Sequence, residues 1–257
     1  MTALAESKAR ELHRTYCITG PEDLADLEAI ANAECLIIEE ADLANCQGKI
    51  RYEQDCGLIK ISSAIREPGA RRFVIAHEMG HFFSESSRLN NCSSRYLTPV
   101  RSNPQNENNA NAFAVEFLMR REWYEAFVKD KDPGIDTIRE AAEYFAVSLS
   151  AAAIRYAQAG NFPIAAIMAH RGRVSWSAIS ESFPYQFIGK SCQVNGSSEA
   201  YAFFRGEEVD TSPHTVLADS WFLNDRNFRR CHFLTEQCLP MPNYKSILTV
   251  LWEEPIK

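Results

Sequence analysis

The stretch Arg71 to Phe83, RRFVIAHEMGHFF, organises the sequence around it, because it carries two histidines and an apolar stripe at helical spacing. A helix with about 3.6 residues per turn places His77 and His81 on one face, about 40° apart. Apolar residues recur at i, i+4, i+7 and i+8, as Ile75, Met79, Phe82 and Phe83. We therefore predict a helix that is buried along one side and presents both imidazoles to a single point.

Within this stretch, His77, Glu78 and His81 form the pattern H-E-x-x-H. Two neutral imidazoles one turn apart can hold Zn²⁺, and the carboxylate between them can accept a proton from the attacking water. Two such histidines also occur by chance on half-buried helices, but the residues that follow Glu78 are uncharged and offer it no ion-pair partner. Gly80 in the helix interior costs about 1 kcal/mol relative to alanine and predicts a close contact there.

A second helix is expected to supply the third ligand, since catalytic zinc takes three protein ligands. Asn103 and Pro104 are a suitable N-cap and first turn for a helix over residues 104–119. Glu107, at the start of this helix, is our candidate ligand. Asn111, one turn later, is placed to hydrogen-bond a ligating imidazole.

Two alternatives to this ligand remain open. In the first, Glu107 only complements the positive end of its helix. In the second, Glu116 binds the metal, although its position would place the ion among aromatic and aliphatic side chains.

The polar stretch over residues 86–106 is expected to cross the mouth of the site. Cys92 lies between the two ligand helices, and a thiolate is a stronger zinc ligand than water, so Cys92 is a candidate inhibitory fourth ligand. The alternative is an ordinary loop cysteine. The oxyanion needs a further donor, and the candidates are Tyr96, Arg95 and Arg101.

The sequences RRFVIAHEMGHFF and ENNANAFAVEFLM together resemble the ImmA/IrrE family of bacterial metallopeptidases, over residues 24–119. The chain departs from the family pattern at Arg120, where the family usually has proline. The resemblance implies a zincin-like domain, zinc held by His77, His81 and Glu107, and Glu78 as the general base. It also implies a substrate, a helix-turn-helix repressor whose cleavage switches on stress, phage or defence genes. A nucleic-acid fragment or nucleotide metabolite is the effector that such a family suggests.

The rest of the chain predicts an α+β fold. Short β-branched runs over residues 35–40, 49–53 and 58–62 indicate a small sheet or meander before the site helix. Residues 135–146 and 149–159 read as a helical pair that resembles a helix-turn-helix, with packing as its expected role. Beyond Phe162 the sequence is strand-like, and family members are often compared there with GAF or PAS sensor modules. Six strands are expected, at residues 163–169, 173–177, 199–204, 215–222, 232–235 and 246–252.

We accordingly predict three segments: a zincin-like metallopeptidase domain at 1–130, the helical pair at 131–160, and a β-rich regulatory domain at 161–257. The chain has no apolar run of the ~20 residues that span a membrane and no secretory signal, so a cytoplasmic protein is expected. Its net charge of −7 disfavours broad contact with nucleic acid. The predicted function is a zinc-dependent endopeptidase that cleaves a repressor. The alternatives are a non-proteolytic anti-repressor and a DNA-binding regulator on the same scaffold.

Overall fold

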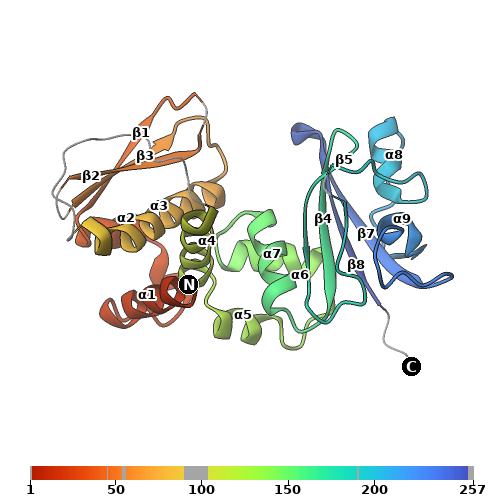
Figure 1. Ribbon diagram of the computed structural model, residues 1–257, viewed down its shortest axis with the longest axis horizontal. Coiled ribbons are helices and arrows are strands. Elements are labelled where there is room, and N and C mark those ends of the chain that lie inside the picture. Colours follow the sequence, from red (N-terminus) through yellow and green to blue (C-terminus); the bar gives the residue numbers. More distant parts are fainter. Residues whose placement is uncertain (1, 45, 54–55, 90–103, 190, 254–257) are drawn as a thin grey trace. The chain divides into compact units, whose positions relative to one another are not determined.

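The computed structural model describes residues 2–44, 46–53, 56–89, 104–189 and 191–253. The chain forms two compact units: Met1–Trp123 with Ala142–Ala151, and Tyr124–Ala141 with Ala152–Lys257. Both units combine helices with a sheet, which confirms the predicted α+β class (Figure 1). The three-segment division stays a prediction.

The first unit opens with α1 (Thr2–Thr15), a short 3₁₀ turn (Pro21–Leu24) and α2 (Leu27–Ala33). Three strands follow: β1 (Leu36–Ala41), β2 (Gly48–Glu53) and β3 (Cys56–Ser62). Their order is β1-β3-β2, with β1 parallel to β3 and β2 antiparallel to it. The small sheet was expected, but the parallel pairing makes it different from a simple meander. As a result β2 lies at one edge.

The long helix α3 (Pro68–Leu89) lies against this sheet, and α4 (Pro104–Leu118) packs on α3 and α1 (Figure 1). The apolar stripe of α3 is inside, since Ile75, Met79 and Phe82 are all buried. A side chain at Gly80 would put its Cβ 2.8 Å from both Cα and the carbonyl oxygen of Ala110, so the two helices touch at this glycine. The close contact that the sequence predicted at this position is confirmed.

Three shorter helices come next: α5 (Arg121–Val128), α6 (Ile135–Tyr144) and α7 (Leu149–Ala159). The last two match the predicted helical pair. Their buried residues are mostly apolar, and Arg155, the one cation of α7, is only 5% exposed. This burial agrees with a packing role.

The second unit contains an antiparallel sheet of β4 (Ile164–His170), β5 (Arg173–Ile179), β6 (His214–Leu217), β7 (Phe233–Met241) and β8 (Ser246–Trp252). The strand order is β5-β4-β8-β7-β6, and a 3₁₀ turn (Pro242–Tyr244) joins β7 to β8. Two helices, α8 (Glu199–Arg205) and α9 (Asp219–Phe222), lie on one face (Figure 1). Their Ala200, Trp221 and Phe222 share a core with Ile167 and Ile247 of the sheet.

Two of the predicted strands are wrong. Residues 199–204 form α8 rather than a strand, because Ser198 caps its first turn and Gly206, at φ 77°, ends it in the left-handed conformation. The expected strand at 215–222 is strand only to Leu217 and then turns into α9. Aromatic-rich segments suit either a helical or a strand period. The caps favour the helix in α8, and the burial of Trp221 favours it in α9.

Within the described residues, no helix has both the length and the apolar composition needed to cross a bilayer.

Candidate metal centre

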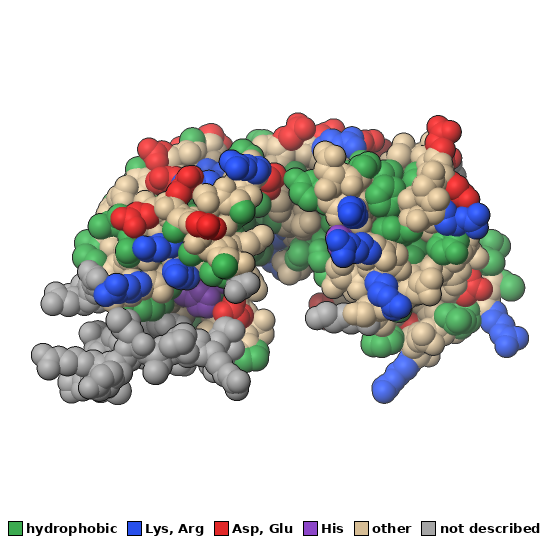
Figure 2. Space-filling view, turned by 90° about the horizontal axis from the view of Figure 1, so that it is seen from above, with side chains coloured by type: hydrophobic (Ala, Val, Ile, Leu, Met, Phe, Trp, Pro, Cys, Tyr) green, Lys and Arg blue, Asp and Glu red, His purple; other side chains and the backbone are tan. Residues whose placement is uncertain are grey.

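The candidate metal site lies at the middle of α3, where His77 and His81 are one helical turn apart. Their rings are 4.7 Å apart between centroids and meet edge to face at 83°. The two Nε2 atoms are 3.1 Å apart and therefore point at the same place. In the part of the molecule that contains α3, Figure 2 shows a histidine surface beside an acidic side chain.

Glu107 joins this pair from the first turn of α4. Its carboxylate oxygens lie 3.4 Å from His77 Nε2 and 3.5 Å from His81 Nε2. The approach depends on Gly80, because a larger residue there would push α4 away from α3. The structure thus brings together the three side chains that the sequence proposed as ligands.

Asn111 holds one of the imidazoles in a defined tautomer. The His77 Nδ1–H donates to Asn111 Oδ1 at 2.9 Å, which leaves the Nε2 lone pair facing Glu107 and His81. Burial, and then the neighbouring His81, lowers the pKa of His77. A neutral imidazole is the form that binds a metal ion.

Glu78 is buried at 6% exposure, next to the start of the edge strand β2. A Cβ on Gly48 would lie 2.8 Å from Glu78 Oε1 and 2.5 Å from Val74 Cγ1. Gly48 therefore leaves the space that the Glu78 carboxylate occupies. Sequence reasoning missed this glycine, since it precedes a strand and reads as an ordinary turn residue.

The donor set fits a zinc ion. Tetrahedral zinc with bonds of about 2.0–2.1 Å has ligand atoms about 3.3–3.4 Å apart. In this site the two Nε2 atoms are 3.1 Å apart, Glu107 Oε2 lies 3.4 Å from His77 Nε2, and Glu107 Oε1 lies 3.5 Å from His81 Nε2. One usable donor atom from each of His77, His81 and Glu107 lies within 4.8 Å of the others. Two nitrogens and one carboxylate form a recurring ligand set of catalytic zinc.

Comparison with known proteins agrees with this geometry. Residues 49–156 match the peptidase M78 family model, described as IrrE N-terminal-like domain. This part of the chain is thus similar to the IrrE N-terminal-like domain family. The match spans most of β2, all of α3 and α4, and most of α7, and it confirms the resemblance to the ImmA/IrrE family.

Full-length comparisons are less specific. A solved structure described as a Mycobacterium tuberculosis transcriptional regulator aligns with 98% of this chain and 76% of its own, with a TM-score of 0.55 and 17% identity. At that identity the likeness shows the fold alone. No curated protein matches the sequence.

Glu116, the alternative to Glu107 as third metal ligand, does not join the two histidines. Its carboxylate is 2% exposed and accepts a 2.7 Å hydrogen bond from Arg10 Nε on α1. The group of donors that can hold a metal includes Glu107 and leaves Glu116 out. Cys92, Tyr96, Arg95 and Arg101 lie outside the described residues.

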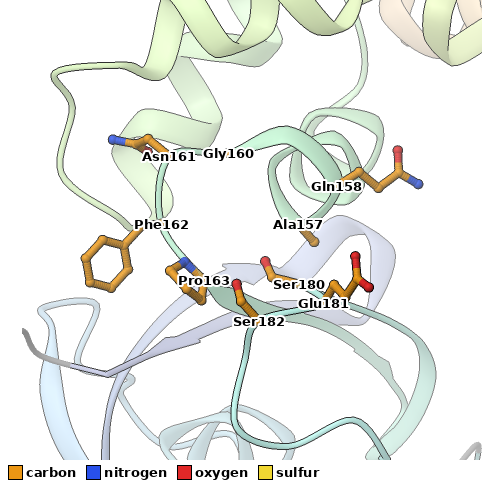
Figure 3. Close-up of a pocket in the computed structure, with 9 residues that line it drawn as sticks. All are labelled: Ala157, Gln158, Gly160, Asn161, Phe162, Pro163, Ser180, Glu181 and Ser182. Atoms are coloured by element: carbon orange, nitrogen blue, oxygen red, sulfur yellow. The ribbon is translucent and has the colours of Figure 1, made fainter.

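The second unit has a small pocket between the end of α7 and the sheet (Figure 3), of about 190 Å³. In Figure 3 the side chains of Gln158 and Phe162 point away from it. Ser180 Oγ already accepts from the Ile164 backbone, and Asn161 bonds Tyr156 and two backbone carbonyls. Ligand sites usually occupy about 300–1,000 Å³, so this pocket gives no support to a sensor site.

Proposed function

We propose that this protein is a zinc-dependent endopeptidase that cleaves a helix-turn-helix transcriptional repressor and so derepresses a stress, phage or defence operon. The observation that carries the peptidase part is the convergence of His77, His81 and Glu107 beside the buried Glu78. The match to a peptidase family supports the same conclusion.

The protein residues have separate tasks in this proposal. His77, His81 and Glu107 would hold the ion, and Asn111 would keep His77 in its metal-binding tautomer. When bound, zinc supplies Lewis acidity, which lowers the pKa of water to about 7 and polarises a carbonyl. Glu78 accepts the proton of the attacking water and returns it to the leaving amine nitrogen.

The edge of the small sheet offers a place for an extended substrate. Within the described residues, β2 pairs with β3 on one side only, so its other edge has backbone groups available for pairing. β2 starts at Gly48, beside Glu78. We infer that a substrate strand adds to this edge and that backbone hydrogen bonds hold its peptide bond near the carboxylate.

A repressor is the proposed substrate because of the resemblance to ImmA/IrrE peptidases, which typically cleave one encoded beside them. The structural neighbour described as a transcriptional regulator fits the same setting. A cytoplasmic location, a nucleic-acid or nucleotide effector, and a GAF-like or PAS-like regulatory role for the second unit belong to this proposal as well.

The first experiment tests as substrate any helix-turn-helix protein that is encoded next to this gene. Wild-type protein with one equivalent of zinc should yield fragments visible by mass spectrometry. Glu78→Gln should keep about one zinc per chain and lose at least about 100-fold in rate, because the proton acceptor is gone. Equal rates for both proteins would refute the general-base role.

The same experiment separates the alternatives. An anti-repressor would release the repressor from its operator without producing fragments. Direct DNA binding has less support, since Arg155 of α7 is buried and the chain carries a net charge of −7.

A further inference from the structure

A surface of the second unit exposes several large apolar side chains. Phe187 is 54% exposed, Leu223 60% and Phe233 59%. Leu217, which is 39% exposed, lies opposite Phe233 in the pairing of β6 with β7. Large aromatic and aliphatic groups exposed to this extent on a folded domain mark an interaction site when they are contiguous.

The buried residues beneath place the exposed residues around one cluster. The Tyr185 ring stacks on Phe222 at 4.8 Å and lies 5.4 Å from the His232 ring. Leu223 directly follows Phe222, Phe233 directly follows His232, and Phe187 is two residues beyond Tyr185. The exposed side chains therefore surround a single cluster, at the end of the sheet where α9 meets the start of β7 (Figure 1).

The segment that joins Leu223 to Phe233 is basic. Its arginines, Arg226, Arg229 and Arg230, are all exposed. In the part of the chain that the structure describes, none of the three guanidinium groups has a carboxylate within ion-pair distance.

Two acidic residues of the described chain near this segment, Asp225 and Glu253, are engaged in other contacts. The buried Asp225 accepts hydrogen bonds from the backbone N–H groups of Gln186, Phe187 and Asn227. Glu253 bonds His232 at 2.7 Å. Because Asp225 ties Phe187 to the basic segment, the apolar and cationic groups keep a common arrangement.

We propose that this surface, formed by Phe187, Leu223, Phe233, Arg226, Arg229 and Arg230, binds an acidic segment of a partner protein that also carries large apolar side chains. Aromatic residues and arginine are the types enriched at the centres of protein interfaces. The three arginines provide charge complementarity to an acidic partner.

The net charge of the chain favours an acidic protein segment over nucleic acid and anionic membranes as the partner. Nucleic acid and anionic membranes are extended negative surfaces, so they repel a chain with a net charge of −7 beyond its local patch. A short acidic segment meets only the patch itself. The inference goes beyond the proposed peptidase activity, since docking requires no cleavage.

The test uses the full chain and a fluorescein-labelled peptide of about 12 residues in which Glu and Asp alternate with Leu and Phe. Fluorescence anisotropy should show saturable binding that weakens as salt is raised. Replacing the acids with lysine, or the apolar residues with serine, should reduce affinity at least about tenfold. Wild-type and Glu78→Gln proteins should bind equally, which separates docking from catalysis.

Variants then locate the site. The double change Arg229→Glu and Arg230→Glu, and separately Phe233→Ser, should each weaken peptide binding at least about tenfold. Arg171→Glu is the matched control. Arg171 and Phe233 lie at opposite ends of the sheet. Arg171 follows His170, which pairs with Ser246 at the start of β8, whereas Phe233 is two residues before Thr235, which pairs with Trp252 at the end of β8.

Three results would overturn the proposal: no peptide binding, peptide binding that the surface variants leave unchanged, or tighter binding of oligo-dT or phosphatidylserine vesicles to the same surface. Circular dichroism of each variant checks that the unit remains folded.

Discussion

At the scale of single residues, two glutamates of α4 illustrate how neighbours determine a role. Glu107 is 38% exposed in its side chain and faces two imidazoles, whereas Glu116 is buried against Arg10. The same functional group is thus available to a metal in one position and already neutralised in the other. Helical spacing puts the two glutamates on opposite faces of α4, since nine residues correspond to about 180°, but which face meets the imidazoles depends on packing.

This difference leads to a prediction about zinc affinity. Glu107→Ala should weaken zinc binding by more than about 100-fold, because even the loss of an outer hydrogen-bond partner costs 10- to 100-fold. Glu116→Ala should keep zinc affinity and instead lower the free energy of unfolding by about 1–3 kcal/mol, since it breaks a charged hydrogen bond. Zinc titration and urea unfolding of both variants provide the measurements. Full zinc affinity in Glu107→Ala would place the third ligand elsewhere.

At the scale of elements, the site depends on how closely a strand and a helix approach each other. β2 passes Glu78 at Gly48, and β3 packs near Phe82 through Gly57, whose Cβ would lie 2.6 Å from Leu36 Cδ2 and 3.4 Å from Phe82 Cδ2. At both glycines, the missing side chain lets another residue's side chain approach the backbone closely. Only Gly48 has a proposed catalytic group as that neighbour.

The two glycines make a matched pair of variants. Gly48→Ala should lower kcat by about tenfold or more while zinc affinity is retained, because the new methyl group displaces the Glu78 carboxylate. Gly57→Ala introduces comparable crowding and should destabilise the fold by about 1–3 kcal/mol without changing kcat in the folded fraction. Steady-state kinetics at saturating zinc test both expectations. Unchanged kcat in folded Gly48→Ala would show that Glu78 tolerates the displacement.

At the scale of the whole molecule, one histidine in each unit has a shifted pKa, and the two shifts predict opposite responses of stability to pH. His13 in the first unit is 1% exposed, its Nε2–H donates to the Phe117 carbonyl at 2.9 Å, and its Nδ1 is buried without a partner. Burial lowers the pKa of His13. His214 in the second unit hydrogen-bonds the buried Glu236 at 3.1 Å, and this bond raises the pKa of His214 to about 9.

The signs follow from proton linkage. A histidine with a lowered pKa costs stability as pH falls below about 6.5, where the unfolded chain takes up the proton more readily. A histidine with a raised pKa contributes its full stability below about pH 6.5 and loses it as pH rises through about 9. The first unit should therefore lose folding stability as pH falls, and the second unit should lose it as pH rises.

Hydrogen exchange resolved by peptide can follow the two units separately. Amides of α1 and α4 should lose protection between pH 7 and 5, after correction for the intrinsic exchange rate. Those of β6 and β7 should lose it between pH 7 and 9. His13→Gln should flatten the acid response and His214→Gln the basic one. Parallel loss of protection in both units at the same pH would contradict the assignment.

Patterns that depend on a few neighbouring residues determined a large part of this protein. The spacing of His77 and His81, the stripe from Ile75 to Phe83 and the start of α4 at Pro104 follow from the helical period and from local caps, so they were predictable. The six expected strands of the C-terminal half were only partly right. Segment 199–204 has apolar residues that suit either period, and its state was set by the Ser198 cap and by Glu236, which accepts from the Glu199 backbone at 2.9 Å.

Contacts between distant parts of the chain were decided by the tertiary structure alone. Arg10 meets Glu116 across 106 positions, and Gly48 meets Glu78 because a strand crosses a helix. Tyr185 likewise contacts Phe222 and His232, beneath the surface formed by Phe187, Leu223 and Phe233. The sequence of any one of these segments does not predict that contact. The physical reason is that periodicity fixes which face of an element is apolar. Which other element covers that apolar face depends on packing in three dimensions.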